Sequence, residues 1–423
     1  MPDQLPATTV PVLVRKYGGS SLATVERIRA VAADLRAARD EGFAVVVVVS
    51  AMGATTDELA AMARRAAAAP PRRELDMLLS VGERITMSLL SMALDDAGCP
   101  AISFTGSQCG IITDTSHTDA RILEVRGDRV REALARGYTV VVAGFQGVSR
   151  EKEITTLGRG GSDATAVALA AALGAVRCEI LKDVDGVMTA DPGQVPAAAR
   201  HEQLSWAEMR DLAASGCGVV HLRAVEYAEQ HRVPLVVRSS FHDGPGTVVG
   251  EAPAPPRPVV PAPRPASAAC DRDLRYRPLV MHVRPAAARL RLATADPAEG
   301  RRLRDEALGR WDPAGAVAEW LDAGPGLRWE VVAKAEDLQP VHAALAAAGA
   351  TDLEFEDGLC CVSLAGGRPD SWLEVLRHVA QVLAALPVPP WRLRADGSAL
   401  RILFSGELAP DVPPALHRAL VRD

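Results

Sequence analysis

Aromatic residues are scarce in this chain: Phe, Trp and Tyr make up 4% of its 423 residues, so the core must be built mainly from aliphatic side chains. An excess of positive charge is also missing. The formal net charge of -6 at pH 7 argues against a nucleic-acid-binding protein, which needs a basic face. Hydrophobic residues at 48% and charged residues at 24% are typical of a soluble globular protein, and the length allows two or three domains.

Signals for disulfides, zinc, secretion and membrane insertion are missing as well. The seven cysteines are odd in number and scattered, and no CxxC pair occurs, which indicates neither a zinc site nor a disulfide framework. A reduced, cytoplasmic setting fits this pattern. The N-terminal stretch has no basic region followed by an apolar one, so it does not read as a signal peptide. The longest apolar runs, such as AVVVVVSAM, are too short to span a bilayer, so we expect no membrane partner.

Strand-like and helix-like segments alternate from residue 10 to about 250. Several strand-like segments are nearly continuous apolar runs, which is typical of strands covered on both faces. We therefore predict an α/β domain over 1–250, with a mostly parallel sheet sandwiched by helices. The predicted strands are 10–17, 44–50, 101–106, 139–145, 178–184 and 234–240. The predicted helices are 22–39, 56–68, 74–97, 119–136, 163–173 and 205–229.

The composition changes after this domain. Residues 251–269, EAPAPPRPVVPAPRPASAA, hold seven prolines and no periodic apolar pattern, which predicts an extended linker. Residues 270–423 return to short strands, such as GLRWEVVA and ALRILFSGE, separated by helical stretches at 297–311, 334–349 and 371–386. This order predicts a ferredoxin-like α+β region. It carries no convergent acid, base or nucleophile, so we interpret it as non-catalytic.

Two glycine- or hydroxyl-rich segments follow predicted strands. In RKYGGSS, Gly18 and Gly19 allow a ligand to approach the backbone closely, and Lys16 suits a phosphate, although a strand-to-helix turn with a surface lysine has the same pattern. In VSAMGATTDEL, the hydroxyls of Ser50 and Thr56 could orient a polar substrate beyond a strand end, although capping of the next helix also explains Thr56.

Two further segments carry weaker signals. Glu83 in SVGERIT interrupts an otherwise apolar helix, where a carboxylate usually faces solvent; its position beside Gly82 favours a functional role only slightly. The segment FTGSQCGIITDTSHTDARI, residues 104–122, is rich in Gly, Thr and Asp, as ligand-facing loops are. Taken alone, this segment is better explained as an ordinary surface loop.

The stretch TLGRGGSDATAVALAAALGA gives the strongest signal. Gly160 and Gly161 permit a tight anion-holding turn, and Ser162 can cap the helix. Capping does not explain Arg159, a cation where the helix dipole already supplies positive potential; a carboxylate substrate does, because Arg binds carboxylates bidentately. Asp163 could then hold Mg²⁺ or orient the acceptor during phosphoryl transfer. No Walker A sequence occurs, which excludes a P-loop kinase.

Over residues 11–250 the chain resembles the aspartate kinases of the amino acid kinase superfamily. The resemblance rests on several motifs in the family's order. They are RKYGGSS, SAMGATTDEL, SVGE, TGSQCGIITDTSHTDARI, GFQG, TLGRGGSD, DVDGVMTADP and VRSSF. It implies ATP-dependent phosphorylation of the side-chain carboxylate of L-aspartate to 4-phospho-L-aspartate, with ATP and Mg²⁺ as cofactors.

The resemblance also implies roles for single residues. Lys16 would stabilise the transferring phosphoryl group, and Asp163 would orient Lys16. Glu83 would meet the α-ammonium group of aspartate, and Arg159 would hold a carboxylate. The full set of implied aspartate contacts is Ser50, Thr56, Glu83, Phe145, Arg159 and Ser162. The implied nucleotide contacts are Gly18, Gly19, Ser20, Gly160, Gly161, Lys182, Asp183 and Met188.

The chain departs from the family pattern on the nucleotide side. Lys182-Asp183 stands where the family has Thr-Asp, Met188 replaces an aromatic residue, and Gly193 replaces an arginine. GCGVVHLRA replaces GAKVLHPRA, so Gly218 stands where a nucleotide-contacting lysine is expected. Either Lys182 replaces the missing cations from a different backbone position, or ATP binding has changed.

These departures leave two other functions open: a related kinase with a changed acceptor or nucleotide in a specialised pathway, and a catalytically silent amino-acid-binding partner subunit. The region 270–423 resembles the ACT modules that follow the kinase domain in this family. Its nearest match to their effector-binding turn, LCCVSLAGGRPDSW, is poor. We therefore expect this region to serve dimer contacts, in a homodimer or higher homo-oligomer.

Overall fold

The computed structural model describes residues 10–251, 278, 280–308, 318–322, 327–366, 372–396 and 399–421. The chain divides into two compact units. Among the described residues, the first unit holds 10–187, 200–210 and 218–251, and the second holds 188–199, 211–217 and the residues from 278 onward. The predicted linker lies outside the described residues, apart from residue 251.

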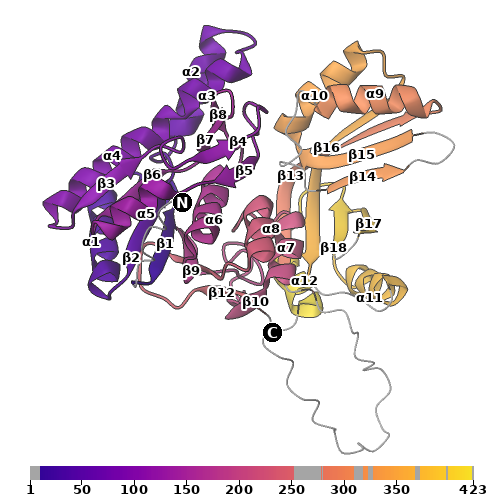
Figure 1. Cartoon of the computed structure of the whole chain (residues 1–423). Coiled ribbons are helices and arrows are strands. Elements are labelled where there is room, and N and C mark those ends of the chain that lie inside the picture. Colours follow the sequence, from indigo (N-terminus) through magenta and orange to yellow (C-terminus); the bar gives the residue numbers. More distant parts are fainter. Residues whose placement is uncertain are drawn as a thin grey trace, which may run out of the picture. The chain divides into compact units, whose positions relative to one another are not determined.

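An eight-stranded sheet forms the centre of the first unit, in the order β10-β12-β11-β9-β1-β2-β6-β3 (Figure 1). Its neighbouring strands run parallel except for the β11–β12 pair, which confirms the predicted mostly parallel sheet. The strands are β1 Val12–Tyr17, β2 Ala44–Val49, β3 Ala101–Phe104, β6 Thr139–Ala143, β9 Arg177–Lys182, β10 Gln203–Ser205, β11 Leu235–Ser239 and β12 Thr247–Gly250.

Helices cover both faces of this sheet, which explains why its central strands are valine-rich and buried. Helices α1 (Val25–Asp40) and α4 (Val81–Asp96) share one apolar cluster with Leu13 of β1. Helix α6 (Gly161–Leu173) packs against β1, β2 and β9. Because side chains alternate along a strand, Lys16 faces the opposite side from Leu13 and Arg15.

A second, four-stranded sheet in this unit has the order β5-β4-β7-β8. Its strands are β4 Ile111–Thr113, β5 Ile122–Val125, β7 Gln146–Ser149 and β8 Ile154–Thr156. The predicted helix over 119–136 is therefore wrong in its first half, because β5 pairs with β4 before helix α5 (Asp128–Ala135) begins after Gly127. The remaining helices near these strands are α2 Thr55–Ala66 and α3 Arg72–Leu79.

The predicted helix over 205–229 is two helices, α7 (Trp206–Ala214) and α8 (Leu222–His231). Gly216, with a φ of +99°, lies in the break between them, in a backbone region that L side chains rarely adopt. Helix α8 packs on α6 within the first unit.

The second unit is built on a six-stranded antiparallel sheet, β14-β15-β13-β16-β18-β17. The order β13-α9-β14-β15-α10-β16 is the predicted ferredoxin-like arrangement. The elements are β13 Val280–Thr294, α9 Pro297–Leu308, β14 Ala318–Asp322, β15 Leu327–Lys334, α10 Ala335–Ala347, β16 Asp352–Ala365, α11 Trp372–Ala384, β17 Trp391–Asp396, β18 Ala399–Phe404 and α12 Val412–Leu420.

Residues 188–199 pack into this second unit, although they precede it in the sequence. Ala190 and Val195 lie in the same apolar cluster as residues of β16, β18 and α12. The buried His417 ring of α12 lies 3.0 Å from the Thr189 hydroxyl. The DVDGVMTADP motif therefore begins in the first unit and ends in the second.

One helical stretch in the described part of the chain, Arg72–Asp96, has the length and apolar composition of a membrane span. Of its most apolar window, 44% is buried inside the fold. Core helices of soluble proteins pass the same test, so this stretch is weak evidence for a membrane.

Candidate active site

A buried ion pair lies where β1 meets the start of α6. The Lys16 side chain, 5% exposed, places its ammonium nitrogen 2.7 Å from Oδ1 of Asp163, which is 2% exposed. Asp163 lies in the first turn of α6, where the backbone N–H groups and the helix dipole also favour negative charge. The structure thus brings the two predicted catalytic residues together.

A second ammonium group reaches the same carboxylate from the neighbouring strand. Lys182, at the end of β9, places its nitrogen 3.1 Å from Oδ2 of Asp163 and donates a hydrogen bond of 2.6 Å to the Val219 carbonyl oxygen. One carboxylate therefore lies between two lysines. Val219 directly follows Gly218, so the Lys182 ammonium lies beside the backbone where the family pattern has its missing lysine.

The electrostatics of this group follow from its burial. Burial alone disfavours the charged form of Asp163, but the ammonium groups of Lys16 and Lys182 hold the pKa of its carboxyl well below its usual range. Burial lowers the pKa of Lys16; Asp163 opposes this shift and Lys182 adds to it. Two lysines share one carboxylate, so an anionic ligand beside them would neutralise the excess positive charge.

The glycines of the GRGG turn are required by tight packing. Gly160 has a φ of +69°, and a Cβ there would lie 2.2 Å from the His221 side chain. A Cβ on Gly161 would lie 2.8 Å from Cβ of Leu157. His221, the N-cap of α8, also directs its backbone N–H toward Oδ2 of Asp163 at 3.4 Å. The turn therefore lies against the start of α8, with Arg159 exposed on it.

The two glycine- and hydroxyl-rich segments after β1 and β2 also meet. A Cβ on Gly19 would lie 3.0 Å from the Ala51 carbonyl oxygen, so this glycine permits close approach of the loop after β2. The Gly18 N–H donates to the Leu181 carbonyl oxygen, and Ser20 begins the short helix η1 (Ser20–Leu22). The hydroxyl-bearing residues Ser50 and Thr56 lie at the end of β2 and in the first turn of α2.

Glu83 is buried rather than solvent-facing. Its side chain on α4 is 3% exposed, and Oε1 accepts a hydrogen bond of 3.2 Å from the Ala51 N–H. Within the described residues, Oε2 is buried and has no hydrogen-bond partner. Burial raises the pKa of Glu83 from 4.5 to about 7. A buried carboxylate oxygen without a donor is suited to an incoming ligand cation.

Phe145 adopts a backbone conformation that is rare for its residue type, with a φ of +67°. Its N–H donates to the Thr165 hydroxyl on α6, and its carbonyl oxygen accepts from the Leu157 N–H at 2.9 Å. A Cβ added to Gly161 would lie 3.0 Å from the Phe145 ring. These contacts fix Phe145 beside the GRGG turn and next to Ser162.

Two predicted nucleotide contacts are not part of this cluster. Asp183 is exposed after β9, and Met188 belongs to the second unit. Sequence reasoning gave no role to three residues that contact the turn or Leu157 before it: His221, Asp119 and Arg223. Asp119 lies in the Gly-, Thr- and Asp-rich segment 104–122, and His221 and Arg223 lie in GCGVVHLRA, which indicated only a missing lysine.

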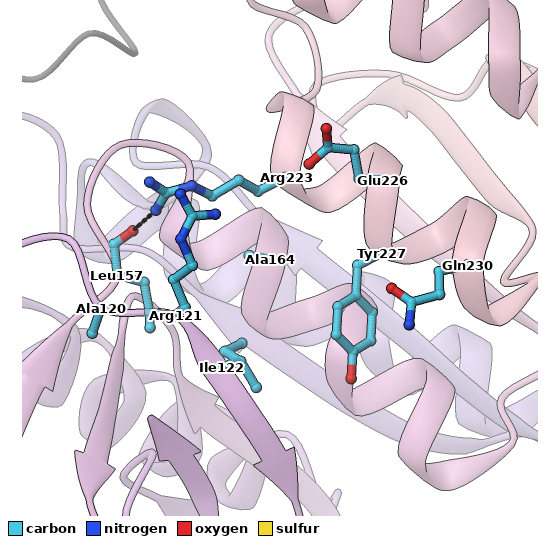
Figure 2. Close-up of a pocket in the computed structure, with 9 residues that line it drawn as sticks. All are labelled: Ala120, Arg121, Ile122, Leu157, Ala164, Arg223, Glu226, Tyr227 and Gln230. Carbon is cyan, nitrogen blue, oxygen red and sulfur yellow. Dashed lines mark hydrogen bonds between the residues drawn. The ribbon is translucent and has the colours of Figure 1, made fainter. Parts of the chain in front are cut away.

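A cavity of about 160 Å³ lies next to the turn, between β5, α6 and α8 (Figure 2). The lining residues are Ala120, Arg121, Ile122, Leu157, Ala164, Arg223, Glu226, Tyr227 and Gln230. Arg223 donates a hydrogen bond of 3.2 Å to the Leu157 carbonyl oxygen, drawn as a dashed line in Figure 2. Neither Lys16 nor Asp163 lines this cavity.

The model of the amino acid kinase family matches residues 11–239. The aspartokinase of Corynebacterium efficiens is 56% identical over 239 residues, which cover 56% of this chain and 57% of that protein. The match thus spans little more than half the length of this curated relative.

Two solved structures extend the likeness to nearly the whole chain. E. coli aspartokinase III in complex with aspartate and ADP shares the fold, with a TM-score of 0.72 at 24% identity, over 97% of this chain and 99% of that chain. The aspartate kinase from Synechocystis is 35% identical, with a TM-score of 0.52, over 97% of this chain and 70% of that chain.

Proposed function

The chain belongs to the amino acid kinase family, and from this premise we propose that it is an aspartate kinase, which transfers the γ-phosphoryl group of ATP to the side-chain carboxylate of L-aspartate. The observation that carries the proposal is the buried Lys16–Asp163–Lys182 group at the carboxyl ends of β1 and β9. Ligands of open α/β sheets bind at this edge.

Two of the three charged groups of the acceptor amino acid have a proposed partner. The unpartnered Oε2 of Glu83 would accept the α-ammonium group, and the exposed guanidinium of Arg159 would bind a carboxylate bidentately. The further aspartate contacts that we propose are Ser50 after β2, Phe145 after β6, and Thr56 and Ser162 in the first turns of α2 and α6.

The phosphate side is cationic and rich in backbone N–H groups. Lys16 and Lys182 would stabilise charge on the phosphoryl oxygens, with Asp163 holding both ammonium groups in place. The further nucleotide contacts that we propose within the first unit are Gly18, Gly19, Ser20, Gly160, Gly161 and Asp183. The residues described hold no group of three His, Cys, Asp or Glu for a metal ion. Mg²⁺ would therefore take its ligands mainly from the phosphates and neutralise their charge.

The reaction needs no covalent enzyme intermediate. A side-chain carboxylate oxygen of aspartate attacks the γ-phosphorus, and the bond from that phosphorus to the β–γ bridging oxygen breaks to release ADP. The protein contributes by holding the two substrates in line and by presenting fixed positive charge where negative charge develops. Asp163 accepts no proton in this scheme, which agrees with its low pKa.

The proposal is tested by phosphoryl transfer from Mg-ATP, with hydroxylamine trapping of the acyl phosphate. L-aspartate is compared with glutamate, with other amino acids and with no acceptor. We expect a hydroxamate signal that depends on aspartate. Signal with another amino acid only would indicate a changed acceptor, and signal with another nucleoside triphosphate only would indicate a changed donor. Aspartate binding without transfer to any acceptor would indicate a silent partner subunit.

The raised pKa of Glu83 predicts a pH dependence of aspartate binding. Only the ionised carboxylate can pair with the ligand ammonium, so we expect the affinity for aspartate to fall as the pH falls below about 7. Glu83→Gln, which keeps the shape of the side chain, should weaken aspartate binding at least about tenfold at pH 8 and remove this dependence. Calorimetric titration between pH 6 and pH 8.5 measures both effects. Equal affinity of the variant and the parent protein at pH 8 would contradict the proposed role.

The same substitution should have the opposite effect on stability. The folded pKa of about 7 exceeds the ordinary value of 4.5, so the folded state binds the proton more tightly and unfolding releases it. Stability without ligand should therefore fall as the pH rises from about 4.5 to about 7. Glu83→Gln should remove this loss, which is on the order of 3 kcal/mol. Urea denaturation of both proteins at pH 5 and pH 8 provides the measurement.

The second unit and the cellular setting complete the proposal. The ferredoxin-like order of the second unit supports an ACT-like role in contacts between copies of the chain, in a homodimer or higher homo-oligomer. We propose a cytoplasmic enzyme with small-molecule partners, because the cysteine pattern indicates a reduced setting and the charge balance argues against nucleic acid.

A further inference from the structure

Asp76 on α3 is a fully buried carboxylate that the proposed mechanism does not use. It is 0% exposed and accepts hydrogen bonds from Nδ1 of His117 at 2.6 Å, from the Thr118 N–H at 3.0 Å and from the Thr156 hydroxyl at 2.5 Å. An ionised carboxylate only accepts, so Nδ1 of His117 carries the hydrogen in this arrangement. A charge is buried at this position only because donors from two separate segments converge on it.

Both of these segments adjoin the GRGG turn: one continues into it along the chain, and the other packs against it. Thr156 ends β8 and is followed by Leu157 and the turn itself. The other segment, residues 117–119, packs against the first glycine of the turn. A Cβ on Gly158 would lie 2.8 Å from Oδ1 of Asp119 and 3.2 Å from the Thr118 carbonyl oxygen, and Gly158 has a φ of +70°.

The 117–119 segment is itself held in a rare conformation by Asp76. Thr118 has a φ of +72°, which is unusual for a β-branched residue and needs support from its surroundings. Part of this support comes from two bonds to the Asp76 carboxylate, one from the Thr118 N–H and one from the adjacent His117 ring. Loss of the carboxylate would release this backbone toward commoner conformations.

Further contacts link the 117–120 segment to Thr156 and Leu157, the residues just before the turn. Asp119 pairs with Arg223 of α8 at 2.7 Å, and Arg223 donates to the Leu157 carbonyl oxygen, the contact drawn in Figure 2. The Ala120 N–H donates to the Thr156 carbonyl oxygen at 2.9 Å. Thr156 and Leu157, which precede the turn, are thus linked to the 117–120 segment by the Ala120 N–H and through Arg223. Thr156 also bonds to Asp76.

We propose that Asp76 is a positioning residue for acceptor binding: it fixes the Gly158–Gly161 turn so that Arg159 and Ser162 meet the substrate. The proposal rests on the proposed aspartate kinase function. Asp76 touches no substrate itself, and its effect passes through Thr156 and the 117–119 segment. The turn follows only two residues after Thr156, so small displacements of β8 reach Arg159 directly, and sub-ångström errors in placement weaken catalysis steeply.

The test uses three variants. Asp76→Asn keeps the shape of the side chain but removes a carboxylate acceptor, and Thr156→Val keeps the shape but removes the hydroxyl donor. Thr156→Ser keeps the hydroxyl. Thr139→Val is a matched control, because Thr139 is buried and hydrogen-bonded to Cys99 at the opposite, amino end of β6.

Steady-state kinetics give kcat and the KM values for aspartate and Mg-ATP. Hydrogen–deuterium exchange of peptides covering 157–162 reports on the turn, whose Gly161 N–H bonds to the Gly158 carbonyl oxygen at 3.0 Å.

Asp76→Asn and Thr156→Val should each raise the KM for aspartate about tenfold, with the KM for Mg-ATP within about twofold, and should speed exchange in the turn. Thr156→Ser should resemble the parent. Thr139→Val should lower the melting temperature but should change neither the KM for aspartate nor exchange in the turn. An unchanged KM for aspartate and unchanged exchange in folded Asp76→Asn protein would overturn the proposal. If the parent protein phosphorylates no aspartate, the proposed function fails, and exchange alone then decides whether Asp76 fixes the turn.

Discussion

Asp163→Asn should lower kcat for phosphoryl transfer at least about 1,000-fold. The substitution keeps the shape of the side chain but leaves the buried ammonium group of Lys16 and the partly buried one of Lys182 without their shared counter-ion. Burial already lowers the pKa of Lys16, and loss of the opposing attraction of Asp163 would lower it further. Lys16 would then lose its charge, or the two ammonium groups would move apart, and the arrangement of positive charge for the phosphoryl group would be lost.

The same variant should lose about 3–5 kcal/mol of stability, since removal of one partner leaves buried charge unpaired. Asp128→Asn is the matched control. Asp128 also lies in the first turn of a helix, α5, but its side chain is 66% exposed and pairs with Arg131 on the surface. Its replacement should cost less than about 1 kcal/mol and leave transfer unchanged. Hydroxylamine trapping and urea denaturation measure the two effects. An Asp163→Asn protein that keeps a tenth of the parent kcat would refute the role of this carboxylate.

The strands that carry the site were predictable because their local pattern and their environment agree. The valine runs of β2 and β6 are apolar on both faces, and both faces are covered in the fold. The helix predicted over 119–136 failed for the opposite reason. Ile122 and Val125 fit a helical pattern locally, but β5 pairs with β4, and this pairing is a contact that the local sequence does not encode.

The Lys16–Asp163 pair followed from family resemblance rather than from any spacing rule, since its members lie on separate elements. The role of Asp76 had no sequence signal at all. In LDMLL it reads as a polar residue on an amphipathic helix, and its burial is compensated by Thr156, which lies 80 positions away in the chain. Glu83 is similar: its burial depends on the Ala51 N–H in a loop of another element. Such sites depend on tertiary contacts, which pattern reasoning along one segment does not supply.

Lys182→Met should raise the KM for Mg-ATP at least about tenfold and lower kcat about 100-fold, with the affinity for aspartate unchanged. Methionine keeps a flexible, unbranched side chain but removes the ammonium group, while Asp163 retains its partner Lys16. Nucleotide binding by calorimetry and transfer by hydroxylamine trapping separate the two effects. Lys152→Met, the same chemical change at an exposed turn, should alter neither. Unchanged nucleotide affinity in Lys182→Met would show that Lys182 serves only as a counter-ion for Asp163.

A second substitution tests whether Lys182 replaces the lysine that the family pattern predicts at the position of Gly218. The Lys182 ammonium bonds to the carbonyl oxygen of Val219, so a lysine at 218 would start beside the same place. Gly218 is exposed, a Cβ there would meet nothing within 4 Å, and its φ lies outside the range that L side chains avoid. Lys182→Thr combined with Gly218→Lys should therefore recover most of the nucleotide affinity that Lys182→Thr loses. Recovery would mean that the site requires a second cation near Asp163, and that residue 182 or residue 218 can supply it. Failure to recover would mean that Lys182 acts through its pairing with Asp163 and Val219 from its own backbone position rather than through direct contact with the nucleotide.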